Sequence, residues 1–297
     1  MRIVIASGKG GTGKTTIATS LFYSMDGQAN IRYVDCDVEA PNGHLSLRPE
    51  FLETVDASMP VPQIQAQLCS HCGRCVDVCQ YHALAKITDT ILVFSQLCHG
   101  CGSCAANCPA NAIIEQPYII GKLELGRVAN GSSFYQGSLL ISEPMATPVI
   151  HQLKRFAGSN PLGMDILDAP PGASCSVVET LQSADYALLV TEPTPFGLHD
   201  LKQMVSVVRE MRIPFGVVIN RDGIGDSELD DFCTAEGLPV LMRIPFERQI
   251  AEYLAQGKTL FDVSGQYLFA FQKLAVEIHR QVMDRAVPEA EKQVLRS

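Results

Sequence analysis

The sequence predicts an α/β fold, with a mostly parallel sheet covered by helices on both faces and a small cysteine-rich α+β module inserted into it. Three observations support this fold class. Short apolar strands alternate with helical segments along most of the 297 residues. A glycine-rich loop follows the first strand, and two runs of four cysteines interrupt the alternation. Alternation of this kind is typical of parallel sheets, and the chain is long enough for one large domain and a module.

Bulk composition narrows the class of protein. Charged residues make up 19% and hydrophobic residues 46% of the chain, as in ordinary globular proteins. A formal net charge of −9 argues against a nucleic-acid partner. No apolar run reaches the roughly 20 residues that a membrane helix needs, and Met1 leads directly into a strand without a charged leader. We therefore expect a cytoplasmic protein that has no stable membrane anchor and does not bind nucleic acid.

The first elements surround the loop. A buried strand is expected at 2–6, a helix from Lys14 to about residue 25, and a second strand at 31–34 that leads into Asp35-Cys36-Asp37. The pattern breaks after residue 42, and prolines at 60, 62 and 117 punctuate the cysteine-rich stretch. We expect a parent domain of residues 1–62 and 118–297, with an inserted module at 63–117.

The alternation resumes after the insert. Strands are expected at 122–128 and 139–142, where the chain rejoins the parent sheet, and then at 164–167, 186–190, 215–219 and 240–244. Helices are expected at about 175–183, 197–212 and 225–236. A last helix at about 264–285 carries an apolar stripe that is suited to core packing. This order predicts parallel pairing of most strands.

The glycine-rich loop predicts a phosphate site. The segment Gly8-Lys9-Gly10-Gly11-Thr12-Gly13-Lys14-Thr15 fits the pattern G-x-x-x-x-G-K-[ST]. Its glycines allow backbone N–H groups to turn toward phosphate oxygens, and the following helix directs its partially positive end to the same place. Lys14 is expected to reach the terminal phosphates and the Thr15 hydroxyl to hold Mg²⁺. A glycine-rich turn without a ligand is the alternative, and the strand–loop–helix context disfavours it.

The cysteines form an internal repeat, because residues 69–85 align with 98–114 without a gap. Each run has the spacing with which bacterial ferredoxins hold a [4Fe–4S] cluster, and in two-cluster ferredoxins the fourth cysteine ligates the other cluster. We expect one cluster on Cys69, Cys72, Cys75 and Cys108, and a second on Cys98, Cys101, Cys104 and Cys79. Zinc is the alternative, although it does not require these spacings twice. Cys36 and Cys233 are expected to be small buried hydrophobes.

Lys9 gives the loop a more specific resemblance. With Thr16, the loop resembles the deviant Walker A motif of the superfamily that contains MinD, ParA, Mrp and the nitrogenase iron protein. The resemblance implies ATP as the ligand and an ATP-dependent homodimer, or a heterodimer with a paralogue, in which Lys9 reaches the partner's phosphates. The alternative is a solvated loop lysine. Asp35-Cys36-Asp37 resembles the first switch, which implies that Asp37 positions the attacking water.

Three further segments resemble landmarks of that superfamily in the same order. Asp168-Ala169-Pro170-Pro171-Gly172 resembles the Walker B strand end and second switch, which implies that Asp168 helps Thr15 to hold Mg²⁺, directly or through water. Asn220-Arg221 resembles the base-reading segment, and Pro245 lies in a segment similar to the loop that closes over adenine. Cys175 follows the second switch at the place where the nitrogenase iron protein keeps a cluster cysteine. A redox or bridging role for Cys175 and a structural thiol both remain open.

The whole chain resembles MinD-superfamily P-loop ATPases that contain an inserted two-cluster ferredoxin domain. This resemblance implies Mg-dependent ATP hydrolysis, in which Lys9 and Lys14 neutralise phosphate charge and Asp37 orients water. Hydrolysis would be coupled to electron transfer through two [4Fe–4S] clusters. An Mrp-like carrier that assembles or delivers clusters and a redox-sensing regulatory ATPase are the alternatives. The redox partner or apo-acceptor protein is not visible in the sequence.

Overall fold

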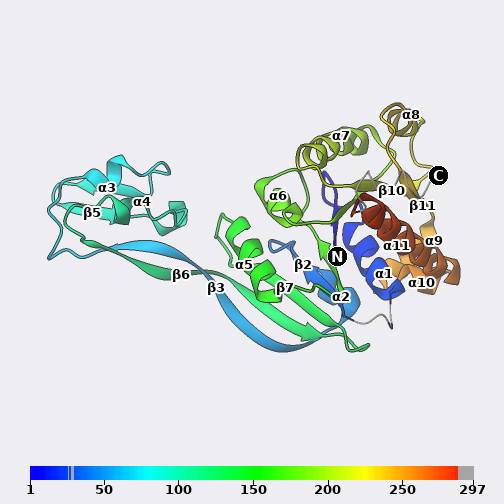
Figure 1. Ribbon diagram of the computed structural model, residues 1–297, viewed down its shortest axis with the longest axis horizontal. Coiled ribbons are helices and arrows are strands. Elements are labelled where there is room, and N and C mark those ends of the chain that lie inside the picture. The colour runs from blue at the N-terminus through cyan, green and yellow to red at the C-terminus, as the bar shows by residue number, and fades with distance from the viewer. Residues whose placement is uncertain (26, 28–29, 287–297) are drawn as a thin grey trace.

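A nine-stranded sheet organises the part of the chain that the computed structural model describes, which is every residue except 26, 28–29 and 287–297. Seven strands pair in parallel in the order β11, β10, β9, β1, β8, β2, β7 (Figure 1). Their bounds are β1 Arg2–Ala6, β2 Ile31–Asp35, β7 Ser133–Leu139, β8 Met164–Asp168, β9 Tyr186–Thr191, β10 Phe215–Asp222 and β11 Val240–Pro245. The predicted α/β fold with a mostly parallel sheet is therefore confirmed.

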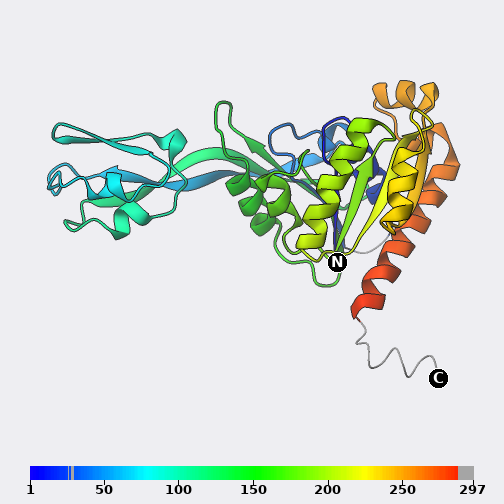
Figure 2. The same ribbon diagram turned by 90° about the horizontal axis from the view of Figure 1, so that it is seen from above.

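Helices cover both faces of this sheet and close two separate cores (Figures 1 and 2). Ile3 and Ile5 pack with α1 (Lys14–Ser24), α2 (Gly43–Leu47), α9 (Arg248–Ala255), α10 (Leu260–Val263) and α11 (Gly265–Ala286). Val4 and Ala6 point to the opposite face, toward α5 (Thr147–Ala157), α6 (Cys175–Leu181), α7 (Pro195–Glu210) and α8 (Glu228–Ala235). Successive residues of a strand face opposite sides, so a strand buried on both faces is apolar throughout. Among the described residues, no helix is both long and apolar enough to cross a membrane.

Two long antiparallel strands continue the sheet beyond β7 and leave it as an arm. These strands are β3 (Glu50–Ile64) and β6 (Ile113–Arg127), and they pair along nearly their whole length. β6 pairs with β7 only over residues 121–127, so the far half of the arm is a two-stranded ribbon. Prolines are tolerated there because both strands of a ribbon have an unpaired edge, and Pro60 lies opposite Pro117. The sequence suggested a break at these prolines, whereas the structure continues the strands through them.

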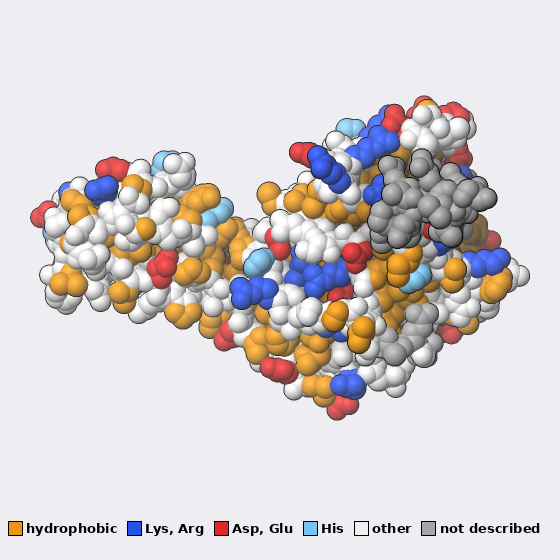
Figure 3. Space-filling model, viewed as in Figure 1, with side chains coloured by type: hydrophobic (Ala, Val, Ile, Leu, Met, Phe, Trp, Pro, Cys, Tyr) orange, Lys and Arg blue, Asp and Glu red, His pale blue; other side chains and the backbone are white. Residues whose placement is uncertain are grey.

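The cysteine-rich residues form a small body at the far end of the arm (Figures 1 and 2). It contains α3 (Arg74–Asp77), the hairpin β4 (Leu84–Ile87) and β5 (Thr90–Val93), a short 3-10 helix η1 (Ser95–Leu97) and α4 (Ser103–Ala106). In space-filling view it projects from one side of the main body, with many hydrophobic side chains on the face shown (Figure 3). We call this lobe, residues 65–112, the cysteine lobe.

One predicted strand was placed wrongly. A strand was expected at 139–142, but β7 ends at Leu139, and Ile141 is 96% exposed in the turn that follows. The polar and glycine-containing residues of β7 hid the strand in the sequence, because Gln136 and Gly137 face neighbouring strands and helices rather than forming an apolar run. The helix α5, which covers β7, was also missed.

Candidate functional site

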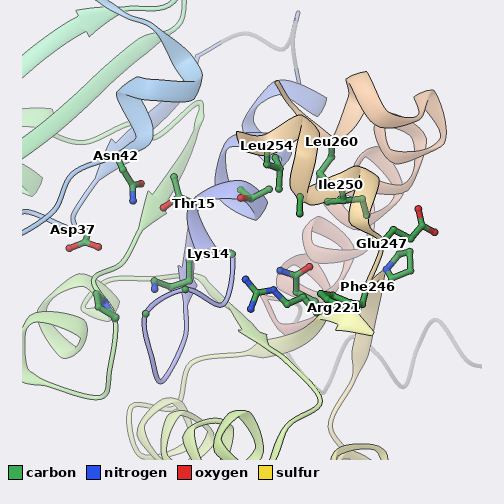
Figure 4. Close-up of a pocket in the computed structure, with 18 residues that line it drawn as sticks. Lys14, Thr15, Asp37, Asn42, Arg221, Phe246, Glu247, Ile250, Leu254 and Leu260 are labelled. Atoms are coloured by element: carbon green, nitrogen blue, oxygen red, sulfur yellow. The ribbon is translucent and has the colours of Figure 1, made fainter. Parts of the chain in front are cut away.

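A pocket of about 430 Å³ lies at the carboxyl ends of the parallel strands, beside the first turn of α1 (Figure 4). This edge of a parallel sheet is where α/β proteins commonly bind ligands. Lys14 and Thr15 lie centrally, with Asp37 and Asn42 on one side and the apolar side chains of α9 and α10 on the other. Its lining residues are Gly10, Gly11, Gly13, Lys14, Thr15, Thr16, Asp37, Asn42, Pro171, Asn220, Arg221, Pro245, Phe246, Glu247, Ile250, Ala251, Leu254 and Leu260.

Close backbone packing explains two glycines of the loop. Gly13 has φ of 92°, in the left-handed region that favours glycine, and an added Cβ would lie 2.5 Å from Asn220 Nδ2. That same amide donates a hydrogen bond to Thr12 O at 2.8 Å, which ties the end of β10 to the loop. An added Cβ at Gly8 would lie 2.4 Å from Asp200 Cβ on α7. The loop is therefore held between two elements that come much later in the chain.

Lys14 is the buried cation of the pocket. Its residue is only 7% exposed, and its Nζ lies 3.5 Å from Lys9 O. Burial lowers the pKa of Lys14, while the nearby carboxylates of Asp168 and Asp37 act in the opposite direction. Asp37 is half-buried at the pocket wall, and burial raises its pKa against the effect of Lys14. The site thus brings one ammonium and two carboxylates together where phosphates and a divalent cation could complete the charge balance.

Asp168 lies beneath the pocket at the end of β8 and is completely buried. Burial raises the pKa of Asp168 to about 6, opposed by the Thr15 hydroxyl, Lys14 and Tyr33. The Tyr33 hydroxyl donates to Asp168 Oδ2 at 3.0 Å, whereas Oδ1 has no hydrogen-bond partner among the described residues. A buried carboxylate oxygen without a partner, close to a threonine hydroxyl, fits the oxygen ligands that Mg²⁺ and its bound waters require.

A second buried carboxylate shapes the loop that carries Asp37 and Asn42. Asp35 accepts hydrogen bonds from the backbone N–H groups of Asp37 at 3.1 Å, Asn42 at 3.1 Å and Gly43 at 2.9 Å. Burial, followed by the charge of Asp168, raises the pKa of Asp35, and the backbone N–H groups of Gly43 and Asp37 oppose that rise. Residues 37–42, which we call the switch loop, are therefore fixed at both ends by a side chain of β2.

Lys9 does not line the pocket. Its ammonium forms an ion pair with Glu192 Oε1, and Arg221 Nη1 lies 3.0 Å from Glu192 Oε2. Glu192 directly follows β9, between the strands that lead to the loop and to Arg221. Its carboxylate is only 7% exposed, so one buried anion holds two cations that the sequence assigns to nucleotide binding. Lys9 therefore forms its ion pair with a residue of its own chain.

The pocket brings together most, but not all, of the residues that were predicted to bind a nucleotide. Gly8, Lys9 and Thr12 belong to the loop but do not line the cavity. Sequence reasoning missed Asn42, whose Oδ1 is buried without a partner among the described residues. It also missed the apolar wall of Ile250, Leu254 and Leu260. The i, i+4 spacing of Ile250 and Leu254 after Pro245 was the available signal.

Two further cavities occupy the cysteine lobe, and each is lined by four cysteines that include one from the other run. The first set is Cys69, Cys72, Cys75 and Cys108, and the second set is Cys79, Cys98, Cys101 and Cys104. These sets have the crossed composition expected from the sequence. No three His, Cys, Asp or Glu side chains in the described part of the chain are gathered tightly enough to hold a single metal ion.

The two halves of the lobe have matching backbone geometry. Residues 71, 73 and 82 have positive φ, and so do their repeat equivalents 100, 102 and 111. Ala83 N donates to Cys79 Sγ and Ala112 N donates to Cys108 Sγ, both at 3.3 Å. Such N–H groups stabilise thiolate sulfur, and they are a known influence on iron–sulfur clusters. The donor set of four thiols per cavity fits a cluster of this kind.

The three remaining cysteines lie apart from the lobe. Cys36 and Cys233 are buried among hydrophobic residues, as predicted. Burial raises the pKa of the Cys36 thiol far above the neutral range, so this thiol stays protonated. Cys175 is exposed at the first position of α6, three residues after Gly172.

Comparison with known proteins identifies the family. The family model described as the CobQ/CobB/MinD/ParA nucleotide binding domain matches residues 3–260. This chain belongs to that family. The prediction that the protein is an ATPase of the MinD/ParA type is thereby confirmed at the level of the family.

Three proteins that are similar to this CobQ/CobB/MinD/ParA family member illustrate the range of its relatives. An uncharacterized protein of Methanocaldococcus jannaschii is 30% identical over 260 residues, covering 87% of this chain and 91% of the relative. An iron-sulfur cluster carrier protein of Pyrococcus furiosus is 23% identical over 277 residues, covering 84% and 76%. The septum site-determining protein MinD of Pyrococcus horikoshii, solved with Mg-ADP, superimposes with a TM-score of 0.56 at 19% identity, covering 93% and 95%. This structural similarity to MinD supports the assignment of the fold.

Proposed function

We propose that this protein is a Mg-dependent ATPase in which two [4Fe–4S] clusters, carried by the cysteine lobe, exchange electrons with a partner under control of the bound nucleotide. The observation that carries the proposal is the presence, in one chain, of a phosphate-loop pocket and two cavities that are each lined by four cysteines. Either the pocket or the cysteine cavities alone would support a function without coupling between nucleotide and clusters.

ATP fits the division of the pocket into a polar and an apolar part (Figure 4). The glycine loop, Lys14 and the N-terminus of α1 would hold the phosphates, since backbone N–H groups and a buried ammonium are suited to a polyanion. Asn220, Arg221 and Pro245 would surround the base, against the apolar wall of α9 and α10. Thr15 and Asp168 would hold Mg²⁺, which neutralises phosphate charge when bound.

Hydrolysis requires a group that orients the attacking water. Asp37 is the candidate, because its half-buried carboxylate faces the pocket close enough to Lys14 for their charges to interact. Asn42 lies on the same side, and both residues belong to the switch loop that Asp35 fixes. In a dimer, Lys9 would have to leave Glu192 to reach the partner's phosphates.

The arm provides a connection between the nucleotide site and the cysteine lobe. Leu139 N donates to Val38 O at 2.8 Å, which joins β7 to the switch loop, and Leu140 N donates to Ile120 O at 2.9 Å, which joins that turn to the arm. The chain also passes directly from the switch loop through α2 into β3. A change in the switch loop on loss of the terminal phosphate would therefore move the base of the arm.

Cluster delivery is the second candidate function, and the similarity to iron-sulfur cluster carrier proteins favours it. In that case the clusters would be cargo, and ATP would control their transfer to an apo-protein. Stable clusters that cycle between redox states would favour electron transfer. Clusters that move to an added apo-acceptor would favour delivery.

Anaerobic preparation followed by metal, sulfide and ATPase assays tests the proposal. We expect about eight iron and eight sulfide per chain, since each cubane contains four of each. We also expect an ATPase rate that differs between oxidised and reduced clusters, and capture of a redox or acceptor protein in an anaerobic pull-down. Zinc without iron–sulfur absorbance would contradict the proposal. An unchanged iron content in a variant with Cys72→Ala and Cys101→Ala would also contradict it.

A further inference from the structure

One pair of opposite charges distinguishes the two halves of the cysteine repeat. Extending the gap-free alignment past its last matched residue places Lys86 opposite Glu115. Both residues occupy the third position of the strand that follows the fourth cysteine of a run, Lys86 in β4 and Glu115 in β6. The repeat therefore preserves the backbone at this position and reverses the charge.

Each of these side chains lies beside the equivalent cysteine of its own half. The Lys86 ammonium donates to His71 O, and a Cβ added to Gly73 would lie 3.7 Å from Lys86 Cδ, so the side chain crosses the segment that contains Cys72. A Cβ added to Gly102 would lie 3.5 Å from Glu115 Oε1, and Glu115 lines the second cavity. The positive charge thus lies at the first set and the negative charge at the second.

The charges on the two short helices do not cancel the difference. The helix α3 carries Arg74 and Asp77, which have opposite signs, and the matching residues of α4 are the neutral Ser103 and Ala106. Matched backbone donors also reach the sulfurs in both halves, as the equal Ala83 and Ala112 contacts show.

We propose, on the basis of the two-cluster function above, that Lys86 and Glu115 give the two clusters different reduction potentials. In the singly reduced protein the electron would then reside on the cluster of Cys69, Cys72, Cys75 and Cys108. Reduction adds one negative charge to a cluster, so a nearby ammonium favours the reduced form and a nearby carboxylate opposes it. Transfer of one electron would oxidise the cluster beside Glu115 and reduce the cluster beside Lys86, with no other change in composition.

The two cavities, and the charges beside them, lie at different positions along the arm. The second cavity adjoins Pro60 and Pro62, whereas the first adjoins Ile64, which lies farther from the parallel sheet along β3. Both charged side chains are exposed, so water and salt weaken their effect. We expect each to change the distribution of an electron between the clusters by roughly threefold to tenfold, where tenfold corresponds to about 59 mV for one electron.

The test is an anaerobic redox titration of the iron-loaded full-length protein, followed by electron paramagnetic resonance with dithionite as reductant. Lys86→Gln should lower the higher potential, and Glu115→Gln should raise the lower one, so either change brings the two potentials together. Exchanging the charges in a Lys86→Glu, Glu115→Lys variant should restore the separation with the order of the clusters reversed. That exchange leaves backbone contacts such as Gly100 N to Cys98 Sγ in place.

Matched controls are Lys122→Gln and Glu53→Gln, which make the same charge changes at exposed positions near the sheet end of the arm. These controls should leave both potentials unchanged. Potentials that do not move in the Lys86 and Glu115 variants, or that move together in both, would overturn the inference. Iron content distinguishes a failure of the proposed function from a failure of the charge assignment. A protein that binds no clusters contradicts the proposed function, whereas a loaded protein with insensitive potentials contradicts only the charge assignment.

Discussion

If Asp168 helps to hold Mg²⁺, as proposed, we expect Mg²⁺ binding at the nucleotide site to depend on pH. Asp168 has a pKa raised by burial to about 6, against an ordinary value of 3.8, so it takes up a proton near pH 6 in the nucleotide-free protein. A protonated carboxyl cannot serve the cation, and metal binding must displace the proton. Because the shift is upward, Mg²⁺ binding should be unaffected above pH 7 and should weaken as the pH falls through 6.

The first prediction is that Mg²⁺-dependent nucleotide affinity falls about tenfold per pH unit below pH 6, as expected for competition with one proton. Calorimetric titration with a non-hydrolysable ATP analogue at pH 7.5, 6.0 and 5.0 measures it. The Asp168→Asn variant is the control, because it keeps the shape and loses the titrating group. Equal pH dependence in the variant and the wild type would assign the effect to the nucleotide instead of Asp168.

The second prediction concerns the ion pair between Lys9 and Glu192. If Lys9 acts across a dimer, Glu192 competes for it in the single chain. Glu192→Gln should then lower the nucleotide concentration needed for dimer formation by roughly twofold to fivefold, since a partly exposed pair contributes about 1 kcal/mol at most. Sedimentation of the wild type, Glu192→Gln, Lys9→Ala and the double variant measures this. Lys9→Ala should abolish the dimer, and an effect of Glu192→Gln that persists without Lys9 would refute the competition.

At the scale of elements, the arm determines how independently the parallel-sheet part and the cysteine lobe can fold. A two-stranded ribbon has little stability of its own, so the far half of β3 and β6 depends on the cysteine lobe, while the near half is held by β7. One core of the parallel sheet lies entirely on the other side of that junction, whereas the other continues along the arm to lobe residues such as Leu84. Because most residues of both cores belong to the parallel sheet and its helices, we expect the ATPase part to stay folded when the far half of the arm is removed with the lobe.

The third prediction follows from the register of the arm, in which Met59 lies opposite Tyr118. Replacing residues 60–117 by an Asn-Gly turn would close a two-residue hairpin at that pair. The shortened protein should bind no iron, retain nucleotide binding within about twofold and unfold cooperatively, as calorimetry and calorimetric titration would show. Loss of cooperative unfolding would mean that the lobe is part of the parent core.

The sequence predicted the parts of the fold in which local pattern and tertiary role agree. β1, α1 and the strands from β8 to β11 are apolar runs between turns, so their positions could be inferred. The arm could not, because β3 and β6 are long, partly exposed and interrupted by prolines, and their pairing joins residues far apart in sequence. α9 and α10 were missed because short helices carry little periodicity. For the same reason the apolar wall of the pocket was missed, although the loop facing it was predicted.

At the residue level, the sequence indicated which residue types form the sites, but it did not indicate which residues they contact. The glycine loop and the crossed cysteine sets depend on spacing, which a sequence records directly. The ion pair of Lys9 with Glu192, the hydrogen bonds that Asp35 accepts and the hydroxyl of Tyr33 on Asp168 depend on neighbouring strands in the sheet order. Strand order is a property of the whole fold, so these partners could be found only in the structure.

At the scale of the whole molecule, the central claim is that nucleotide and clusters share a coupling free energy. The switch loop contacts β7 through Val38, and the turn after β7 contacts the arm through Ile120, so a physical path joins the two sites. Coupling between binding sites is reciprocal, because each ligand must change the other's affinity by the same factor. If the arm were only a tether, neither site would respond to the other.

A redox titration with and without Mg²⁺ and a non-hydrolysable ATP analogue tests this claim most directly. The fourth prediction is that the analogue shifts at least one cluster potential, and that reduction changes the affinity for the analogue by the same factor. For a coupling of about 1.4 kcal/mol that factor is roughly tenfold, which corresponds to about 59 mV for one electron. Identical potentials in both titrations, together with equal analogue affinity in the oxidised and reduced protein, would contradict the account.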